Sequence, residues 1–132
     1  MRFFATAATA AAVFGAAALA DETVQLKDIT VRVTGSEPQA ASFTAQPDNV
    51  SCSATTPDDL KNVAVCGESA YRFALKNGSN GFWALTVYKQ TAPGAGLSAT
   101  KEIQPTHCHA GGNGADDNVC DVADTDITLK SD

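Results

Sequence analysis

Two histidines and two cysteines near the C-terminus are the residues whose types could bind a metal ion. His107, Cys108 and His109 are consecutive, and Cys120 follows after a short loop. Thiolate and imidazole are the usual ligands of structural zinc, but such a site needs free thiolates. In an oxidising compartment a disulfide would consume these thiols. We therefore predict no metal and no cofactor, and we interpret the two histidines as loop residues.

A glycine-rich segment lies between those two cysteines. Gly111, Gly112 and Gly114 surround Asn113, and the segment approaches the G-G-x-G-x-D repeat of calcium-binding parallel β-helices. Such calcium sites form between stacked repeats, so one copy supplies only half of the oxygen ligands. We interpret the acidic residues here as a solvated face and keep weak calcium binding as the alternative. These residues are Asp116, Asp117, Asp121, Asp124 and Asp126.

The sequence offers little on which catalysis could rest. It has no Gly-x-Ser-x-Gly motif, and both histidines stand in one tripeptide around Cys108. A serine nucleophile would therefore lack an obvious base. The carboxylates gather at predicted turns and in the C-terminal tail, which does not favour the facing pair of a glycosidase. We predict no enzyme activity and no catalytic residue.

The first 20 residues are typical of a secretory signal peptide. Arg2 precedes an apolar run rich in alanine and phenylalanine, which ends in the small-x-small cleavage pattern Ala18-Leu19-Ala20. The predicted mature protein is a single domain, residues 21–132, that is secreted and extracellular. Its four cysteines are then expected to form two disulfides, for which three pairings are open.

The composition is acidic and excludes two classes of partner. The full sequence has a formal net charge of −6, and removal of Arg2 with the signal leaves eight basic against 15 acidic residues. Phosphate backbones and anionic membrane surfaces would repel such a chain. We predict no nucleic-acid binding and no membrane binding.

Alternation of apolar and polar residues predicts short antiparallel strands along most of the mature chain. The apolar parity changes between Leu26 and Ile29, so a bulge is predicted at Lys27 and Asp28. One brief helical turn is expected after Thr56, which is a good N-cap. Further strands are predicted at residues 42–46, 50–54, 71–76, 82–89, 97–103 and 125–129. The predicted fold class is all-β, a small antiparallel barrel or sandwich of seven to ten short strands with two disulfides.

The clearest strand pair is a hairpin that turns at residues 77–81. In its second arm the residues predicted to face the core are Trp83, Leu85 and Val87. The outer set contains Phe82, Thr86 and Tyr88, which we predict to form a contact surface for a protein partner. The alternative is that a neighbouring loop covers both aromatic rings. Asn49 and Asn77 begin sequons at predicted turns and are candidate glycosylation sites.

Several stretches around the cysteines resemble a known protein family. They are Cys108-His109-Ala110-Gly111-Gly112-Asn113-Gly114, Val119-Cys120, Val122-Ala123-Asp124, Ile127-Thr128-Leu129, and the surroundings of Cys52 and Cys66. The chain is similar here to the Alternaria major allergen family, Alt a 1. The resemblance implies a fungal secreted β-barrel with disulfides Cys52–Cys66 and Cys108–Cys120. The type member has a further N-terminal cysteine that links two chains, which this sequence lacks, so no covalent dimer is expected.

The same resemblance implies a function in recognition. Family members act as effectors or elicitors at plant surfaces and engage thaumatin-like defence proteins of the host. The alternative that it implies is a carrier of a small flavonoid-like phenolic ligand, although Tyr71, Phe73 and Trp83 are bulky enough to fill a short barrel. A secreted toxin or inhibitor is a third reading. His109, which replaces an arginine of the type member, and Asn113 complete the predicted contact residues.

Overall fold

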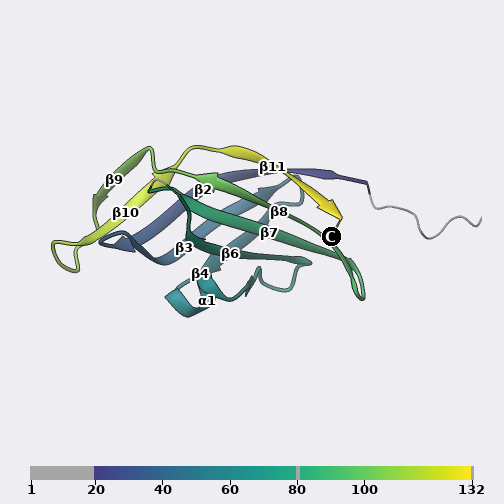
Figure 1. The fold of residues 1–132 in the computed structure, drawn as a ribbon, viewed down its shortest axis with the longest axis horizontal. Helices are drawn as coiled ribbons and strands as arrows, with labels where there is room; N and C mark the ends of the chain where they lie inside the picture. The colour runs from purple at the N-terminus through teal and green to yellow at the C-terminus, as the bar shows by residue number, and fades with distance from the viewer. Residues whose placement is uncertain (1–19, 80, 132) are drawn as a thin grey trace, which may run out of the picture.

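The computed structural model describes residues 20–79 and 81–131, which form a nearly closed antiparallel β-barrel (Figure 1). The predicted all-β class with two disulfides is confirmed. Residues 1–19 of the predicted signal peptide, Asn80 of the hairpin turn, and Asp132 lie outside the described residues. The elements are β2 (Glu22–Thr34), β3 (Glu37–Gln46), β4 (Val50–Ala54), α1 (Pro57–Lys61), β5 (Ala64–Val65), β6 (Tyr71–Asn77), β7 (Trp83–Ala92), β8 (Ala95–Ile103), β9 (His107–Ala110), β10 (Asp117–Val122) and β11 (Thr125–Ser131).

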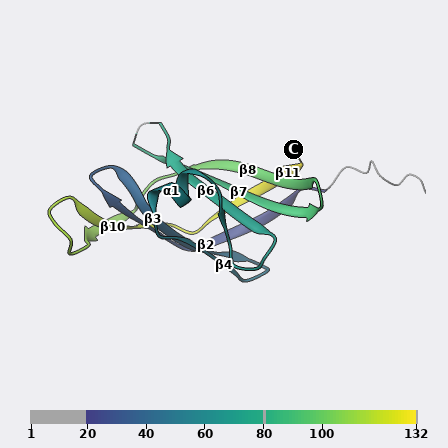
Figure 2. The same ribbon diagram turned by 90° about the horizontal axis from the view of Figure 1, so that it is seen from below.

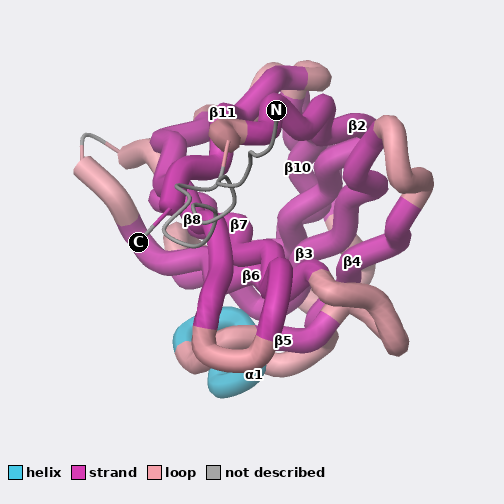
Figure 3. Tube along the Cα trace, turned by 90° about the vertical axis from the view of Figure 1, so that its right-hand side faces the viewer, coloured by secondary structure: helices cyan, strands magenta, loops and turns pink. Residues whose placement is uncertain are grey.

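The strands follow one another around the barrel in the order β4-β3-β2-β11-β8-β7-β6-β5 (Figure 3). Strand β2 is shared, because its first half pairs with β11 and its second half with β10. The change of partner coincides with the predicted bulge, where Asp28 has a φ of 55° and the register with β3 shifts after Lys27. Strand β10 also pairs with β9, so these two strands form a ribbon beside the barrel wall (Figures 1 and 2).

The barrel interior is filled with apolar side chains from the inward parity of the strands. Trp83, Leu85 and Val87 are buried as predicted, and the Phe43 and Phe73 rings meet edge to face at 5.0 Å between centroids. Each such aliphatic or aromatic side chain contributes about 1.5–3 kcal/mol when it is fully buried. The inward residues of each strand therefore provide the main driving force for closing the sheet.

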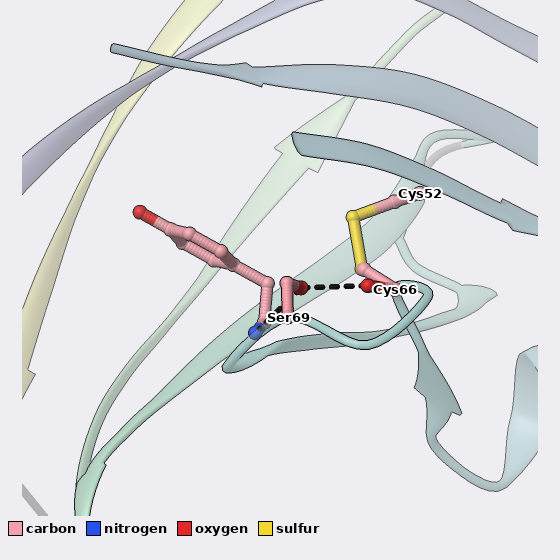
Figure 4. Close-up of a disulfide and its surroundings, with 4 residues drawn as sticks. Cys52, Cys66 and Ser69 are labelled. Carbon is pink, nitrogen blue, oxygen red and sulfur yellow. Dashed lines mark hydrogen bonds between the residues drawn. A yellow bond between two sulfur atoms is a disulfide. The ribbon is translucent and has the colours of Figure 1, made fainter. Parts of the chain in front are cut away.

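The first and last strands of the sheet, β4 and β5, meet at a seam that a disulfide crosses. Cys52 in β4 is bonded to Cys66, which directly follows β5. Figure 4 shows how the Cys66 end is held: its carbonyl oxygen accepts a hydrogen bond of 2.6 Å from Ser69 Oγ, which in turn accepts one of 3.1 Å from the Tyr71 backbone N–H. No ladder among the described strands joins β4 to β5, so the disulfide is the covalent link between these two edge strands.

The short helix α1 packs over the same seam. As predicted, Thr56 is its N-cap, with Oγ1 accepting a 3.2 Å hydrogen bond from the Asp59 N–H, and Pro57 opens the helix. Leu60 is 1% exposed and belongs to the same core as the strands. Because Leu60 is buried there, the helix covers the seam. Within the described residues, no helix is long and apolar enough to cross a membrane.

A polar network closes one end of the barrel. The Tyr71 hydroxyl donates a 2.8 Å hydrogen bond to Asp48 Oδ2, and Lys89 Nζ contacts Glu22 at 2.7 Å. Burial, with the Asp48 hydrogen bond second, raises the pKa of Tyr71 to about 12. The network ties the β3–β4 turn to β6, β7 and β2, so the turn that carries the sequon residue Asn49 is fixed to the barrel wall.

The seam makes a specific prediction about the two disulfides. They enclose similar lengths of chain, 14 and 12 residues apart, so removal of either pair by alanine substitution should cost about 3 kcal/mol of unfolding free energy. Hydrogen exchange should distinguish the two variants from each other. Loss of Cys52–Cys66 should speed exchange in β4 and β6, whereas loss of Cys108–Cys120 should speed it only in β9 and β10. Equal patterns in the two variants would contradict the role of the seam.

Candidate functional site

A cleft of about 510 Å³ lies between the β9–β10 ribbon and the β6–β7 turn, and we call it the end cleft. The Cys108–Cys120 disulfide forms part of one wall, and Phe82 and Trp83 form part of the other. Asn77 and Ser36 complete its rim. Phe82 is half-buried and Trp83 is 5% exposed, so the cleft offers an aromatic wall close to solvent. Such a concave surface with few polar groups is suited to a small apolar ligand.

An ion pair holds the ribbon against β2. Asp117, 6% exposed, accepts hydrogen bonds from Arg32 Nε at 2.9 Å and Nη2 at 2.6 Å. Arg32 Nη2 also donates to the Gly111 carbonyl at 3.2 Å, and Asp117 Oδ2 accepts from the Asn113 backbone N–H at 3.0 Å. The hydrogen bond from Arg32 is the main reason why the pKa of Asp117 lies below its ordinary value. The pair thus fixes the glycine-rich loop in one position.

The structure corrects the interpretation of the acidic segment as one solvated face. Four of its aspartates are exposed, but Asp117 is buried against Arg32. The contact between Arg32 and Asp117 explains why residue 111 is a glycine, because a Cβ at that position would overlap the Asp117 carboxylate. Gly112 and Gly114 have φ values of 95° and 121°, which favour glycine.

A second candidate surface runs across the outer face of the sheet, and we call it the outer row. The strand registers place Val65 opposite Arg72, and Arg72 opposite Tyr88, so these three side chains project to the same side. Val65 is 52% exposed, Arg72 is exposed and Tyr88 is half-buried. Arg72 and Tyr88 also line a shallow cavity of about 410 Å³. Tyrosine and arginine are enriched at protein contact surfaces.

The predicted contact residues do not form one surface. Phe82 precedes β7 and lines the end cleft, whereas Tyr88 lies towards the other end of β7 in the outer row. Thr86 is also on the outer face, where its hydroxyl is 2.7 Å from that of Thr100. His109 and Asn113 belong to the ribbon and its loop. The five residues are thus distributed over three places: the end cleft, the outer face of the sheet, and the ribbon with its loop.

The two sequons have different surroundings. Asn49 is exposed in the β3–β4 turn, with Oδ1 accepting a 3.0 Å hydrogen bond from Gln46 Nε2. Asn77 is exposed at the end of β6 on the rim of the end cleft. A glycan on Asn77 would therefore stand at the mouth of the cleft. Glycosylation of either residue stays a prediction.

The sequence did not indicate the contact of Arg32 with Asp117, or that Val65 and Arg72 lie beside the predicted contact residue Tyr88. Arg32 stands between Val31 and Val33 in an alternating strand, where an outward arginine is unremarkable. Its partner lies 85 residues away, so no local spacing indicates the pair. The outer row depends on the register of β5, a strand of two residues that has no alternation of its own.

Comparisons with known proteins support the observed fold. Residues 28–120 match the family model described as Alternaria alternata allergen 1. The chain is 36% identical to the effector protein PevD1 of Verticillium dahliae over 87% of this chain and 85% of that protein. Two crystal structures of the Alternaria alternata allergen Alt a 1 match with TM-scores of 0.63 and 0.62. Both are 24% identical over 83% of this chain, covering 87% and 92% of theirs, and show the same fold.

The Arg32–Asp117 pair predicts the behaviour of the loop in acid. Because the folded pKa of Asp117 is lowered, the pair stabilises the fold above about pH 4, and this contribution is lost as the pH falls through the folded pKa. Gly111→Ala should displace the carboxylate, raise the pKa of Asp117 towards its ordinary value and speed hydrogen exchange in the loop. Carboxyl titration by NMR measures the pKa directly.

Ala115→Ser is the matched control, since Ala115 is exposed in the same loop. It should leave the pKa of Asp117 unchanged. An unchanged pKa in Gly111→Ala would show that Arg32 does not hold this carboxylate.

Proposed function

Because this chain belongs to the Alternaria alternata allergen 1 family, we propose that it is a secreted fungal effector that acts by binding an extracellular protein of a plant host. The observation that carries the proposal is its 36% identity with the effector PevD1, which extends over 85% of that protein. The two disulfides support the extracellular location, because such bonds persist in oxidising compartments. The proposed action is binding rather than catalysis.

The outer row is the contact surface that we propose for the host protein. Val65 and neighbouring Val63, 52% and 45% exposed, are the large apolar side chains most open to solvent among the described residues. Arg72 and the half-buried Tyr88 lie beside them. An exposed apolar strip with an arginine and a tyrosine resembles the central part of many interfaces. These side chains lie on hydrogen-bonded strands, so their backbone loses little conformational entropy on binding.

The chemistry of the chain favours a basic partner. Its net charge is −6, and exposed aspartates lie on β10, on β11 and between them. Opposite charge on a partner would increase the association rate and make it salt-dependent. A thaumatin-like defence protein of the host is the partner that we propose. All four cysteines are consumed within the chain, so we expect it to act without a covalent dimer.

A matched pair of aromatic substitutions tests the contact surface. Tyr88→Ser changes the outer row, whereas Phe82→Ser changes the end cleft beyond the other end of the same strand. In a pull-down from plant apoplastic fluid, the wild type should retain a basic defence protein at low salt. Tyr88→Ser should reduce its retention about tenfold or more, the effect of an aromatic interface residue, while Phe82→Ser should not.

Failure of the wild type to retain any basic protein would contradict the proposed partner class. Equal retention by Tyr88→Ser and the wild type would instead exclude the outer row. Near-ultraviolet circular dichroism of both variants checks that each is folded.

The end cleft favours a second candidate function, the binding of a small flavonoid-like phenolic compound. Phe82 offers an accessible aromatic surface, and the volume of the cleft, about 510 Å³, is in the range of small-ligand sites. The barrel interior, in contrast, is filled by Tyr71, Phe73 and Trp83. The ligand would therefore lie at the barrel end and not inside it.

Trp83 reports on this cleft without ambiguity, because the sequence contains one tryptophan. Titration with a flavonoid should quench its fluorescence to saturation. Phe82→Ser should weaken that binding about tenfold or more, since the aromatic wall is lost. Tyr88→Ser should leave it unchanged. Quenching that is linear and unsaturable, or equal in Phe82→Ser, would exclude a phenolic site in the cleft.

A further inference from the structure

We propose that His107 and His109 form a surface site for a divalent transition-metal ion, with copper(II) as the preferred ion. Both residues lie in β9, a strand of the ribbon and not the loop that was predicted for them, and both are exposed. The site is independent of the thiols, which are bonded to each other. It therefore differs from the closed zinc site that the sequence analysis excluded, and it goes beyond the proposed function.

The geometry of the two rings fits a single ion. Residues two apart in a strand project to the same face, and the ring centroids are 6.0 Å apart. With metal–nitrogen bonds of about 2.0 Å, two imidazoles on one ion have centroids about 4.5 Å apart at a right angle and about 6.4 Å apart in a linear arrangement. The observed separation lies inside this range. The spacing of the two rings is therefore compatible with chelation of one ion.

Neither imidazole has another partner in the described part of the chain. The two rings lie next to each other, and no hydrogen bond from the described residues competes for their nitrogens. No set of three or more ligand side chains gathers in residues 20–79 and 81–131. The two imidazoles are thus the protein's ligands, and solvent would complete the coordination.

The ribbon holds the two ligands in position. Cys108, between them, faces the other side and is bonded to Cys120 directly across the ribbon. On the histidine face, Val119 lies opposite His109 and the exposed Asp121 opposite His107. Asp121 adds negative charge beside the ion. Because the disulfide and the ladder fix the two backbone positions, chelation needs to order only the side chains, which favours binding.

The ligand set selects the class of ion. Imidazole suits copper, zinc and nickel, and for a given nitrogen site the affinity of divalent ions is highest for copper(II). Two imidazoles with open positions also suit the tetragonal geometry that copper(II) prefers. We therefore expect copper(II) to bind more tightly than zinc(II), and neither magnesium nor calcium to compete.

Copper titration of the whole secreted protein tests the site. These are the two histidines of the sequence, so His107→Ala, His109→Ala and the double variant isolate the site fully. Calorimetry with copper(II) chloride, in a buffer containing glycine as a weak competitor, should give one site per chain. Each single variant should lose about tenfold or more in affinity, because one imidazole alone cannot chelate.

Paramagnetic resonance of the copper complex provides a second readout. The wild type should show two imidazole nitrogens on copper, each single variant one, and the double variant none. Asn113→Ala, an exposed change on the same ribbon, is the matched control and should bind as the wild type does.

Wild-type affinity in either single variant would overturn the proposal, as would a wild-type copper spectrum in the double variant. The latter would assign binding to the chain's N-terminal amine instead. Because both histidines are exposed on an outer strand, the variants should fold, and circular dichroism checks that they do.

Discussion

The Cys52–Cys66 disulfide joins the strand at one end of the sheet to the segment that follows the strand at the other end. Strands β4 and β5 are the two edges of the described sheet, and the disulfide holds these edges next to each other. Leu60 of α1 fills the same seam with apolar volume. The seam is therefore held by one covalent bond and one buried side chain, in addition to the apolar core that drives closure of the sheet.

The positions of β11 and of the β9–β10 ribbon depend on how β2 divides its pairing between β11 and β10. Its bulge at Asp28 lets β11 continue the barrel while β10 and β9 leave it as a ribbon. The Arg32–Asp117 pair then fixes the loop of that ribbon, and the end cleft forms between the ribbon and the β6–β7 turn. One small domain thus presents three separate surfaces, which are the outer row, the end cleft and the histidine face of the ribbon. Each of them is assigned to a different proposed function.

Local sequence patterns predict most of the framework and little of the site. Alternation identifies the inward residues of β7 and β11, and Thr56 with Pro57 identifies the start of α1, because these features depend on near neighbours. The resemblance to the family implied the disulfide pairs Cys52–Cys66 and Cys108–Cys120. The burial of Asp117 and the separation of Phe82 from Tyr88 depend on contacts and registers between distant segments, which a single sequence does not encode in any local spacing.

Peptide mapping of the unreduced protein by mass spectrometry tests the closure of the barrel, because the closed barrel requires one particular pairing of cysteines. We expect a peptide pair that links Cys52 to Cys66 and another that links Cys108 to Cys120. A bond from Cys52 to either C-terminal cysteine, or free thiols in the folded protein, would contradict the closure of the sheet and the ribbon geometry together.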